Sequence, residues 1–247
     1  IVVCIAMMVP TVAFAATSSP AKVDVKSATA KSLTYNAKSQ TTTIVVNGKT
    51  LTLNKDFKVV SGSLKATKAG TYTVKIKGIG NYSGDTTVKY TVNAQQSYKA
   101  TAAAKTYNAK NQTTKVTVKY GNTVLKRGTD YKITGVTRAK NAGKYKVTVK
   151  GINNYKGTKT IYYTINKAAQ KSVKVKVNAS KKKITVSGVK AKAKVTYKSA
   201  NKKVKVKNGK ITVGKGVKKG TKVRITVKVA ATKNYKAYSK SIIYKVK

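Results

Sequence analysis

The chain has 247 residues, with 54 Lys and Arg against 4 Asp and Glu, no His, and a formal net charge of +50. General acid–base catalysis needs paired carboxylates or His, and metal sites need clustered His, Cys, Asp or Glu. We therefore predict no catalytic, cofactor-binding or metal-binding residues, and no enzyme. Val, Ile, Thr and Tyr are abundant and Trp is absent, which is typical of strands.

Residues 1–15 carry no charge and end in Ala13-Phe14-Ala15. An apolar stretch that ends in small residues is typical of a secretory signal, so we predict a signal peptide that begins before Ile1. A membrane anchor would need about 20 apolar residues. Cys4 is the only cysteine, so the chain after cleavage has no disulfide. These features favour a secreted protein or one on a bacterial cell surface.

Two copies of one module follow, and we place them at residues 16–95 and 96–168. Their landmarks recur in the same order, about 73 residues apart, a period that suits a small all-β domain. The paired landmarks are Tyr35–Thr42 with Tyr107–Thr114, Asp56-Phe57 with Asp130-Tyr131, Ala69–Val74 with Ala142–Val147, and Tyr90–Asn93 with Tyr163–Asn166.

Within each copy the apolar residues alternate with polar ones. In residues 144–150, Tyr145, Val147 and Val149 fall on one face and the lysines on the other, which predicts a half-buried antiparallel strand. Asn47-Gly48 and Gly121-Asn122 lie between such runs and favour hairpin turns. Two stacked sheets would bury the apolar faces.

Residues 169–247 form a third, divergent module. Val173–Val177 and Lys203–Lys207 alternate strictly, and the latter leads through Asn208-Gly209 into another apolar run, which predicts a hairpin. The junctions near residues 93–101 and 166–172 are short and polar. We therefore expect three modules joined as a semi-rigid rod.

A Gly-x-x-Asn-Tyr-x-Gly stretch marks the turn between the last two strands of each copy, at residues 78–84 and 151–157, with a degenerate form at 233–237. Its glycines permit positive φ and Asn tolerates the left-handed region. The tyrosines of these turns are either open to a partner or folded over the end of the sandwich. The turn markers are Asn81, Tyr82, Asn154, Tyr155, Asn234 and Tyr235.

Ala69-Gly70-x-Tyr72-x-Val74 and Ala142-Gly143-x-Tyr145-x-Val147 resemble the penultimate-strand signature of immunoglobulin-like (Ig-like) domains. The resemblance makes Tyr72 and Tyr145 candidate tyrosine corners, with valine at the cysteine position.

With the other landmarks, both copies resemble Ig-like repeats of bacterial surface proteins. Through Val195–Asn201 the third module is similar to the invasin/intimin-type bacterial Ig-like domain, although Val223 replaces the corner tyrosine. The resemblance implies three tandem Ig-like antiparallel β-sandwiches after the signal peptide. It also implies a surface spacer or adhesive module.

Two features that look like sites are better explained structurally. Residues 209–216 nearly match a phosphate-binding P-loop, but Gly216 replaces the Ser or Thr and the context is strand–turn. Asp56 and Asp130 recur before an aromatic residue, and we expect them to cap a turn or pair with a nearby Lys. A Lys–Asn isopeptide bond assisted by such an Asp is permitted by the composition but not favoured.

The lysine excess is the remaining functional signal. Solvation and protection of edge strands account for many lysines, but not for the near-absence of Asp and Glu. We expect salt-sensitive, nonspecific partners outside the cell: anionic cell-wall polymers, acidic polysaccharide or extracellular DNA. The chain is thus either a spacer or adhesive rod held to the envelope by charge, a polyanion-binding protein, or an appendage of a larger surface enzyme.

Overall fold

The computed structural model describes residues 20–247, and the predicted signal peptide lies outside them. The described part is all-β, with strands joined by turns and two short 3-10 helices, and it forms tandem β-sandwiches as predicted. The chain divides into two compact units, Ile1–Gln95 and Gln96–Lys247. The sheets of the second unit fall into two separate groups, within residues 99–166 and 174–245. We name the three parts the N-terminal (20–95), middle (96–168) and C-terminal (169–247) sandwiches.

The N-terminal sandwich packs a four-stranded sheet, β3-β11-β9-β7, against a three-stranded sheet, β2-β5-β6. Two further two-stranded sheets, β1-β10 and β4-β8, belong to this part of the chain. Its elements are β1 (Val23–Asp24), the 3-10 helix η1 (Val25–Ser27), β2 (Thr29–Ala30), β3 (Leu33–Thr34), β4 (Gln40–Thr41), β5 (Ile44–Val46), β6 (Lys49–Thr50), β7 (Phe57–Gly62), β8 (Lys65–Ala66), β9 (Gly70–Gly78), β10 (Tyr82–Ser83) and β11 (Asp85–Asn93).

The long strands β9 and β11 form the centre of this sandwich because every second residue is apolar. Their antiparallel register places Val74 opposite Val88 and Tyr72 opposite Tyr90. Val74 is completely buried. Burial of one valine contributes about 1.5–3 kcal/mol, so apolar packing stabilises the centre of this sandwich. The short edge strand β3 pairs with β11 in parallel, an exception to the antiparallel pattern.

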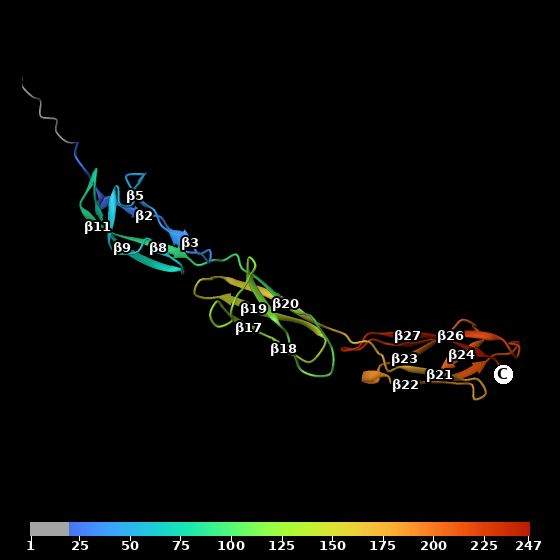
Figure 1. Cartoon of the computed structure of the whole chain (residues 1–247). Coiled ribbons are helices and arrows are strands. Elements are labelled where there is room, and N and C mark those ends of the chain that lie inside the picture. The colour runs from blue at the N-terminus through green and yellow to red at the C-terminus, as the bar shows by residue number, and fades with distance from the viewer. Residues whose placement is uncertain (1–19) are drawn as a thin grey trace, which may run out of the picture. The chain divides into compact units, whose positions relative to one another are not determined.

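The middle sandwich repeats this plan with the sheets β13-β20-β19-β17 and β12-β15-β16, closed by the pair β14-β18 (Figure 1). Val147 opposite Ile161 and Tyr145 opposite Tyr163 reproduce the central register. Its strands are β12 (Lys99–Ala102), β13 (Lys105–Thr106), β14 (Gln112–Thr113), β15 (Val116–Tyr120), β16 (Thr123–Val124), β17 (Tyr131–Gly135), β18 (Arg138–Ala139), β19 (Gly143–Gly151) and β20 (Thr158–Asn166).

The C-terminal sandwich packs β21-β22-β25-β24 against β23-β26-β27. Its core contains Ile211, Ile225, Val227 and Tyr244, all buried. Its elements are β21 (Lys174–Asn178), β22 (Lys183–Ser187), the 3-10 helix η2 (Lys190–Lys192), β23 (Val195–Ser199), β24 (Val204–Lys207), β25 (Lys210–Val213), β26 (Lys222–Val229) and β27 (Tyr238–Lys245).

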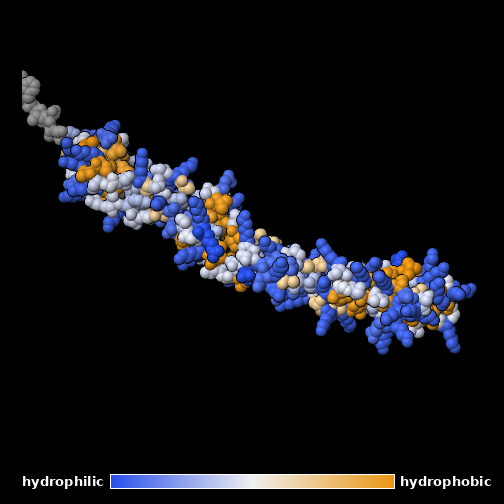
Figure 2. Space-filling model, turned by 60° about the horizontal axis from the view of Figure 1, so that its bottom comes forward, coloured by the Kyte–Doolittle hydropathy of each residue, from blue (hydrophilic) through white to orange (hydrophobic). Residues whose placement is uncertain are grey.

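The three predicted hairpin turns are confirmed. Asn47-Gly48 joins β5 to β6, and Asn208-Gly209 joins β24 to β25, with all four residues at positive φ. Gly121-Asn122 joins β15 to β16. These tight turns set the strand register, so the apolar face of each strand meets the core and the lysines remain outside. Hydrophilic side chains consequently project over much of the surface, between small hydrophobic patches (Figure 2).

Candidate functional site

The candidate corner tyrosines make equivalent contacts in the first two sandwiches. The Tyr72 hydroxyl donates to the Lys68 carbonyl at 2.8 Å, and the Tyr145 hydroxyl donates to the Asn141 carbonyl at 2.7 Å. Each bond reaches four residues upstream and fixes the loop that enters the long strand, which is the contact expected of a tyrosine corner.

Each candidate corner tyrosine stacks on a buried tyrosine of the next strand, with 5.2 Å between ring centroids. The pairs are Tyr72 with Tyr90 and Tyr145 with Tyr163. The Tyr90 hydroxyl donates to the Ser63 carbonyl at 3.0 Å, whereas the Tyr163 hydroxyl has no hydrogen-bond partner among residues 20–247. Burial, and secondarily the neighbouring phenol, raises the pKa of both Tyr90 and Tyr163.

The Gly-x-x-Asn-Tyr-x-Gly turns are shaped by their first glycine. A Cβ on Gly78 would lie 2.7 Å from the Ser83 nitrogen, so only glycine permits this approach. The residues at positive φ are Gly80 and Gly84 in the first copy and Asn153 and Gly157 in the second, so glycines take such positions as predicted. The expectation that the repeated asparagines, Asn81 and Asn154, adopt the left-handed conformation is wrong, because the residue before each of them does so.

The tyrosines of the first two turns point inward. Tyr82 is only 6% exposed and Tyr155 only 4%. The Tyr155 ring meets Tyr98 and Tyr120 edge to face, at 6.2 and 5.9 Å between centroids. Of the two alternatives for these side chains, the geometry matches the fold over the end of the sandwich, where they are inaccessible to a partner.

Tyr98 is a structural residue that the sequence did not single out, because it lies in a junction that reads as a polar linker. It is 2% exposed. Its hydroxyl accepts a hydrogen bond from the Gly151 N–H at 3.0 Å and donates one to the Gly157 carbonyl at 2.8 Å. It thereby joins the first and last residues of the second turn. The chain entering the middle sandwich is thus part of that sandwich's core.

The third turn has a different role, since it joins the middle and C-terminal sandwiches within the second unit. The Asn234 Oδ1 atom accepts a hydrogen bond from the Ala142 N–H at 2.8 Å, and its Nδ2 atom donates to Asn141 Oδ1 at 3.0 Å. Asn141 is also the residue whose carbonyl accepts from Tyr145. The asparagine therefore connects the third turn to the candidate tyrosine corner of the preceding sandwich.

Tyr235 completes this joint. Its ring packs edge to face on Tyr107, with 5.4 Å between centroids, and its backbone pairs with Ala168. The structure thus brings Tyr145, Asn234 and Tyr235 together. In this copy the turn therefore does more than connect the last two strands of its own sandwich. We call these contacts of Tyr107, Asn141, Ala142, Ala168, Asn234 and Tyr235 the joint.

The repeated aspartates are turn caps, as predicted. Asp56 accepts the Thr52 N–H at 2.8 Å, and Asp130 accepts the Lys126 N–H at 2.7 Å. The P-loop-like stretch continues from strand β25 into a turn, which confirms the strand–turn context. Residues 20–247 contain no group of three His, Cys, Asp or Glu side chains that could hold a metal ion.

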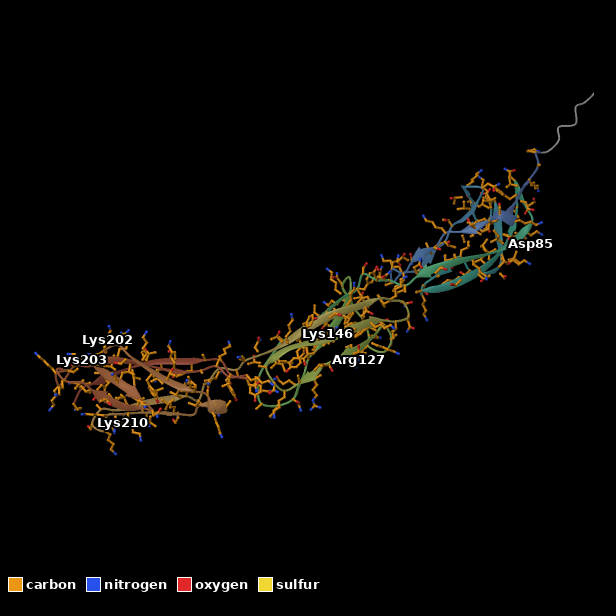
Figure 3. All side chains as sticks on the ribbon, turned by 180° about the vertical axis from the view of Figure 1, so that it is seen from behind. Asp85, Arg127, Lys146, Lys202, Lys203 and Lys210 are labelled. Carbon is orange, nitrogen blue, oxygen red and sulfur yellow. The ribbon has the colours of Figure 1, made fainter. Side chains whose placement is uncertain are left out.

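Lysines occupy outward positions on the sheets of every sandwich. On β19, Lys144, Lys146 and Lys150 are exposed while the intervening Val147 and Val149 are buried. Figure 3 shows such side chains projecting from the ribbons, with Lys146 and Lys210 labelled. Within the described part of the chain only two ion pairs form, Lys26–Asp24 at 4.0 Å and Lys75–Asp85 at 3.2 Å. The positive charge is therefore largely uncompensated by the protein itself.

No protein-family model matches this chain, and no curated protein does. Solved structures match at low identity: Drosophila N-cadherin EC1-4 (11% identity, 94% of this chain and 74% of that one, TM-score 0.25), Sidekick-1 immunoglobulin domains 1-5 (12%, 90% and 58%, TM-score 0.26) and the human desmocollin-1 ectodomain (8%, 92% and 57%, TM-score 0.21). Within residues 20–247, no helix is long and apolar enough to cross a membrane.

The two stacked tyrosine pairs provide a matched test of hydroxyl burial. We expect Tyr90→Phe to lower the free energy of unfolding by about 1 kcal/mol, because the Ser63 carbonyl loses its donor. Tyr163→Phe should be neutral or stabilising, since its hydroxyl is buried without a protein partner. Urea unfolding of the full chain, with hydrogen exchange reporting on each sandwich, measures both. Equal losses of unfolding free energy in the two variants would contradict the assignment of a hydrogen bond to the Tyr90 hydroxyl and of none to the Tyr163 hydroxyl.

Alkaline pH should destabilise the sandwiches through these same phenols. Burial raises the folded-state pKa of Tyr163 above the ordinary value of about 10, so the neutral phenol favours the folded state. Its contribution is complete below pH 10 and is lost as pH rises through the folded-state pKa. Lysine deprotonation also changes stability in this pH range. The wild type is therefore compared with Tyr163→Phe, which has the same lysines. The wild type should lose more stability between pH 9 and pH 11 in urea unfolding, and an identical pH profile would refute the prediction.

We expect Asn234→Ala to destabilise the joint locally. This change removes both side-chain hydrogen bonds to the middle sandwich, at a cost of about 1–2 kcal/mol. We expect the Ala142 amide to exchange with solvent roughly tenfold faster. Asn178→Ala is the control, because its side chain caps a hairpin of the C-terminal sandwich at Lys181. Unchanged exchange at Ala142 in Asn234→Ala would show that the joint contributes no stability.

Proposed function

We propose that this chain is a non-catalytic, secreted or surface-displayed bacterial protein that acts as a spacer or adhesive module, retained on the envelope by its cationic surface. The observation that carries the proposal is the unbalanced charge, 54 basic against 4 acidic residues. The fold adds that the lysines stand on outward strand positions, where a polyanion can reach them.

The physical mechanism of retention is counterion release. A surface lysine that neutralises a phosphate or carboxylate of a polymer frees a condensed counterion, and binding weakens steeply as salt rises. Such binding needs no shaped pocket and no conformational change. It suits sandwiches whose interiors are apolar and whose surface charge comes almost entirely from ammonium groups.

The non-catalytic part of the proposal rests on what the side chains offer. The aspartates with the most regular placement, Asp56 and Asp130, are occupied as turn caps. The most deeply buried tyrosine hydroxyls either donate to backbone carbonyls or lie in the core. The chemistry left on the surface is cationic and hydroxylic, which suits attachment to an anionic polymer.

A salt wash tests the proposal on the cells that carry the protein. We expect raising NaCl from 50 to 500 mM to release the protein, because several polymer contacts together lower affinity by orders of magnitude over such a range. Neutral sucrose at the same osmolarity is the control for osmotic effects. Retention in high salt would contradict attachment by charge.

A further inference from the structure

The sheet β21-β22-β25-β24 of the C-terminal sandwich carries an unusual outer face. Ile184, Val204 and Ile211 point into the core and are buried. Because side chains alternate along a strand, the residues between them face solvent. The exposed lysines of this face are Lys174, Lys176, Lys183, Lys205, Lys207 and Lys210.

Three of these lysines stand side by side. The hairpins β21-β22 and β24-β25 overlap by a single residue pair, which sets Lys183 opposite Lys210. Lys210 is in turn opposite Lys207 on β24. We call Lys183, Lys210 and Lys207 the lysine row. Adjacent Cβ atoms in such a row lie about 4.5–5.5 Å apart.

Elsewhere in residues 20–247 lysines face one another in pairs at most, such as Lys99 with Lys119 and Lys222 with Lys245. In the opposite sheet of the same sandwich, Lys198 faces Thr226, which faces Ser241. In the N-terminal sandwich Lys77 lies between Lys58 and Asp85, so a carboxylate ends the run. No other described register places more than two lysines in succession.

The lysine row is electrostatically unfavourable by itself. Like charges directly opposite one another destabilise a sheet. No carboxylate of this sandwich relieves the repulsion, because the last acidic residue of the chain is Asp130. A hydroxyl residue such as Thr212, which faces Lys205 in the next row, would suit the same positions without cost. The repulsion disappears when an external polyanion lies across the row.

We propose that the lysine row binds a linear phosphodiester polymer that lacks bases, such as a polyol phosphate, and this rests on the proposed retention by charge. Lysine binds phosphate as a point charge, so the contact does not require a fixed orientation of the phosphate group. The flexible lysine stems let three ammonium groups follow successive phosphates of a chain.

The other residues of this face argue against a nucleic acid. Single-stranded nucleic acids bind where aromatic side chains stack on the bases. The other outward residues of these strands are Asn178, Thr185, Ser187 and Thr212. Their amide and hydroxyl groups can bond to phosphate oxygens or to sugar-like hydroxyls but offer no stacking surface.

The test compares two triple variants of the full chain with the same net charge. Lys183→Thr/Lys207→Thr/Lys210→Thr removes the lysine row. Lys198→Thr/Lys222→Thr/Lys228→Thr removes three exposed lysines from the other sheet of the same sandwich. Fluorescence anisotropy with labelled poly(glycerol phosphate), oligothymidylate and hyaluronate, between 50 and 200 mM NaCl, measures affinity and its salt dependence.

For poly(glycerol phosphate) we expect the row variant to bind at least tenfold more weakly at 50 mM NaCl. The slope of log affinity against log salt should fall by about 2, since each phosphate contact on a single strand contributes about 0.7. The control variant should lose less than threefold. The row variant should melt no lower than wild type, because its change removes like-charge repulsion and adds a strand-favouring residue.

Equal losses in the two variants would overturn the proposal, since binding would then follow net charge alone, while the proposed retention by charge would stand. Row-dependent binding of oligothymidylate or hyaluronate that exceeds binding of poly(glycerol phosphate) would overturn the assignment to a base-free phosphodiester. If the wild type bound none of the three probes at 50 mM NaCl, both the lysine row and the proposed function would be wrong.

Discussion

The structure depends on strict two-residue alternation along its strands. A chain with a formal charge of +50 can fold only if its ammonium groups stay in water, because an unpaired buried charge costs several kcal/mol. Alternation achieves this on β9, β11, β19 and β20, where the buried Val and Tyr residues are followed by an outward Lys, Thr or Asn. The apolar core and the cationic surface are therefore two results of one pattern.

The same pattern explains how tyrosine contributes to these cores. A tyrosine fills a large volume at an in-facing position while its hydroxyl reaches the backbone at the sheet's end, as Tyr72, Tyr90 and Tyr145 do. Tyr98 extends the principle to a junction, where one phenol satisfies two backbone groups of a turn. The cores are thereby linked to the loops that connect one sandwich to the next.

Much of this could be predicted from the sequence, because alternation and turn dipeptides are local signals. The strands, the hairpin at Asn208-Gly209 and the capping by Asp56 follow from neighbouring residues alone. The joint could not be predicted, because Asn234 contacts Asn141 and Ala142, which precede it by more than ninety residues in the sequence. Likewise Tyr98 reads as linker, since its partners Gly151 and Gly157 lie in a turn formed much later in the chain.

The lysine row shows most clearly where local reasoning ends. Lys183, Lys207 and Lys210 each belong to an ordinary alternating run, and nothing in those runs distinguishes them from the other lysines. Their adjacency arises because two hairpins meet at one residue pair, Lys183 with Lys210. A protein that needed lysine only for solubility could interrupt such a row with threonine, as Thr226 does after Lys198 in the opposite sheet. The polyanionic partner that we propose removes the repulsion within the row, which ties the only succession of three lysines in the registers of residues 20–247 to the chemistry of the whole surface.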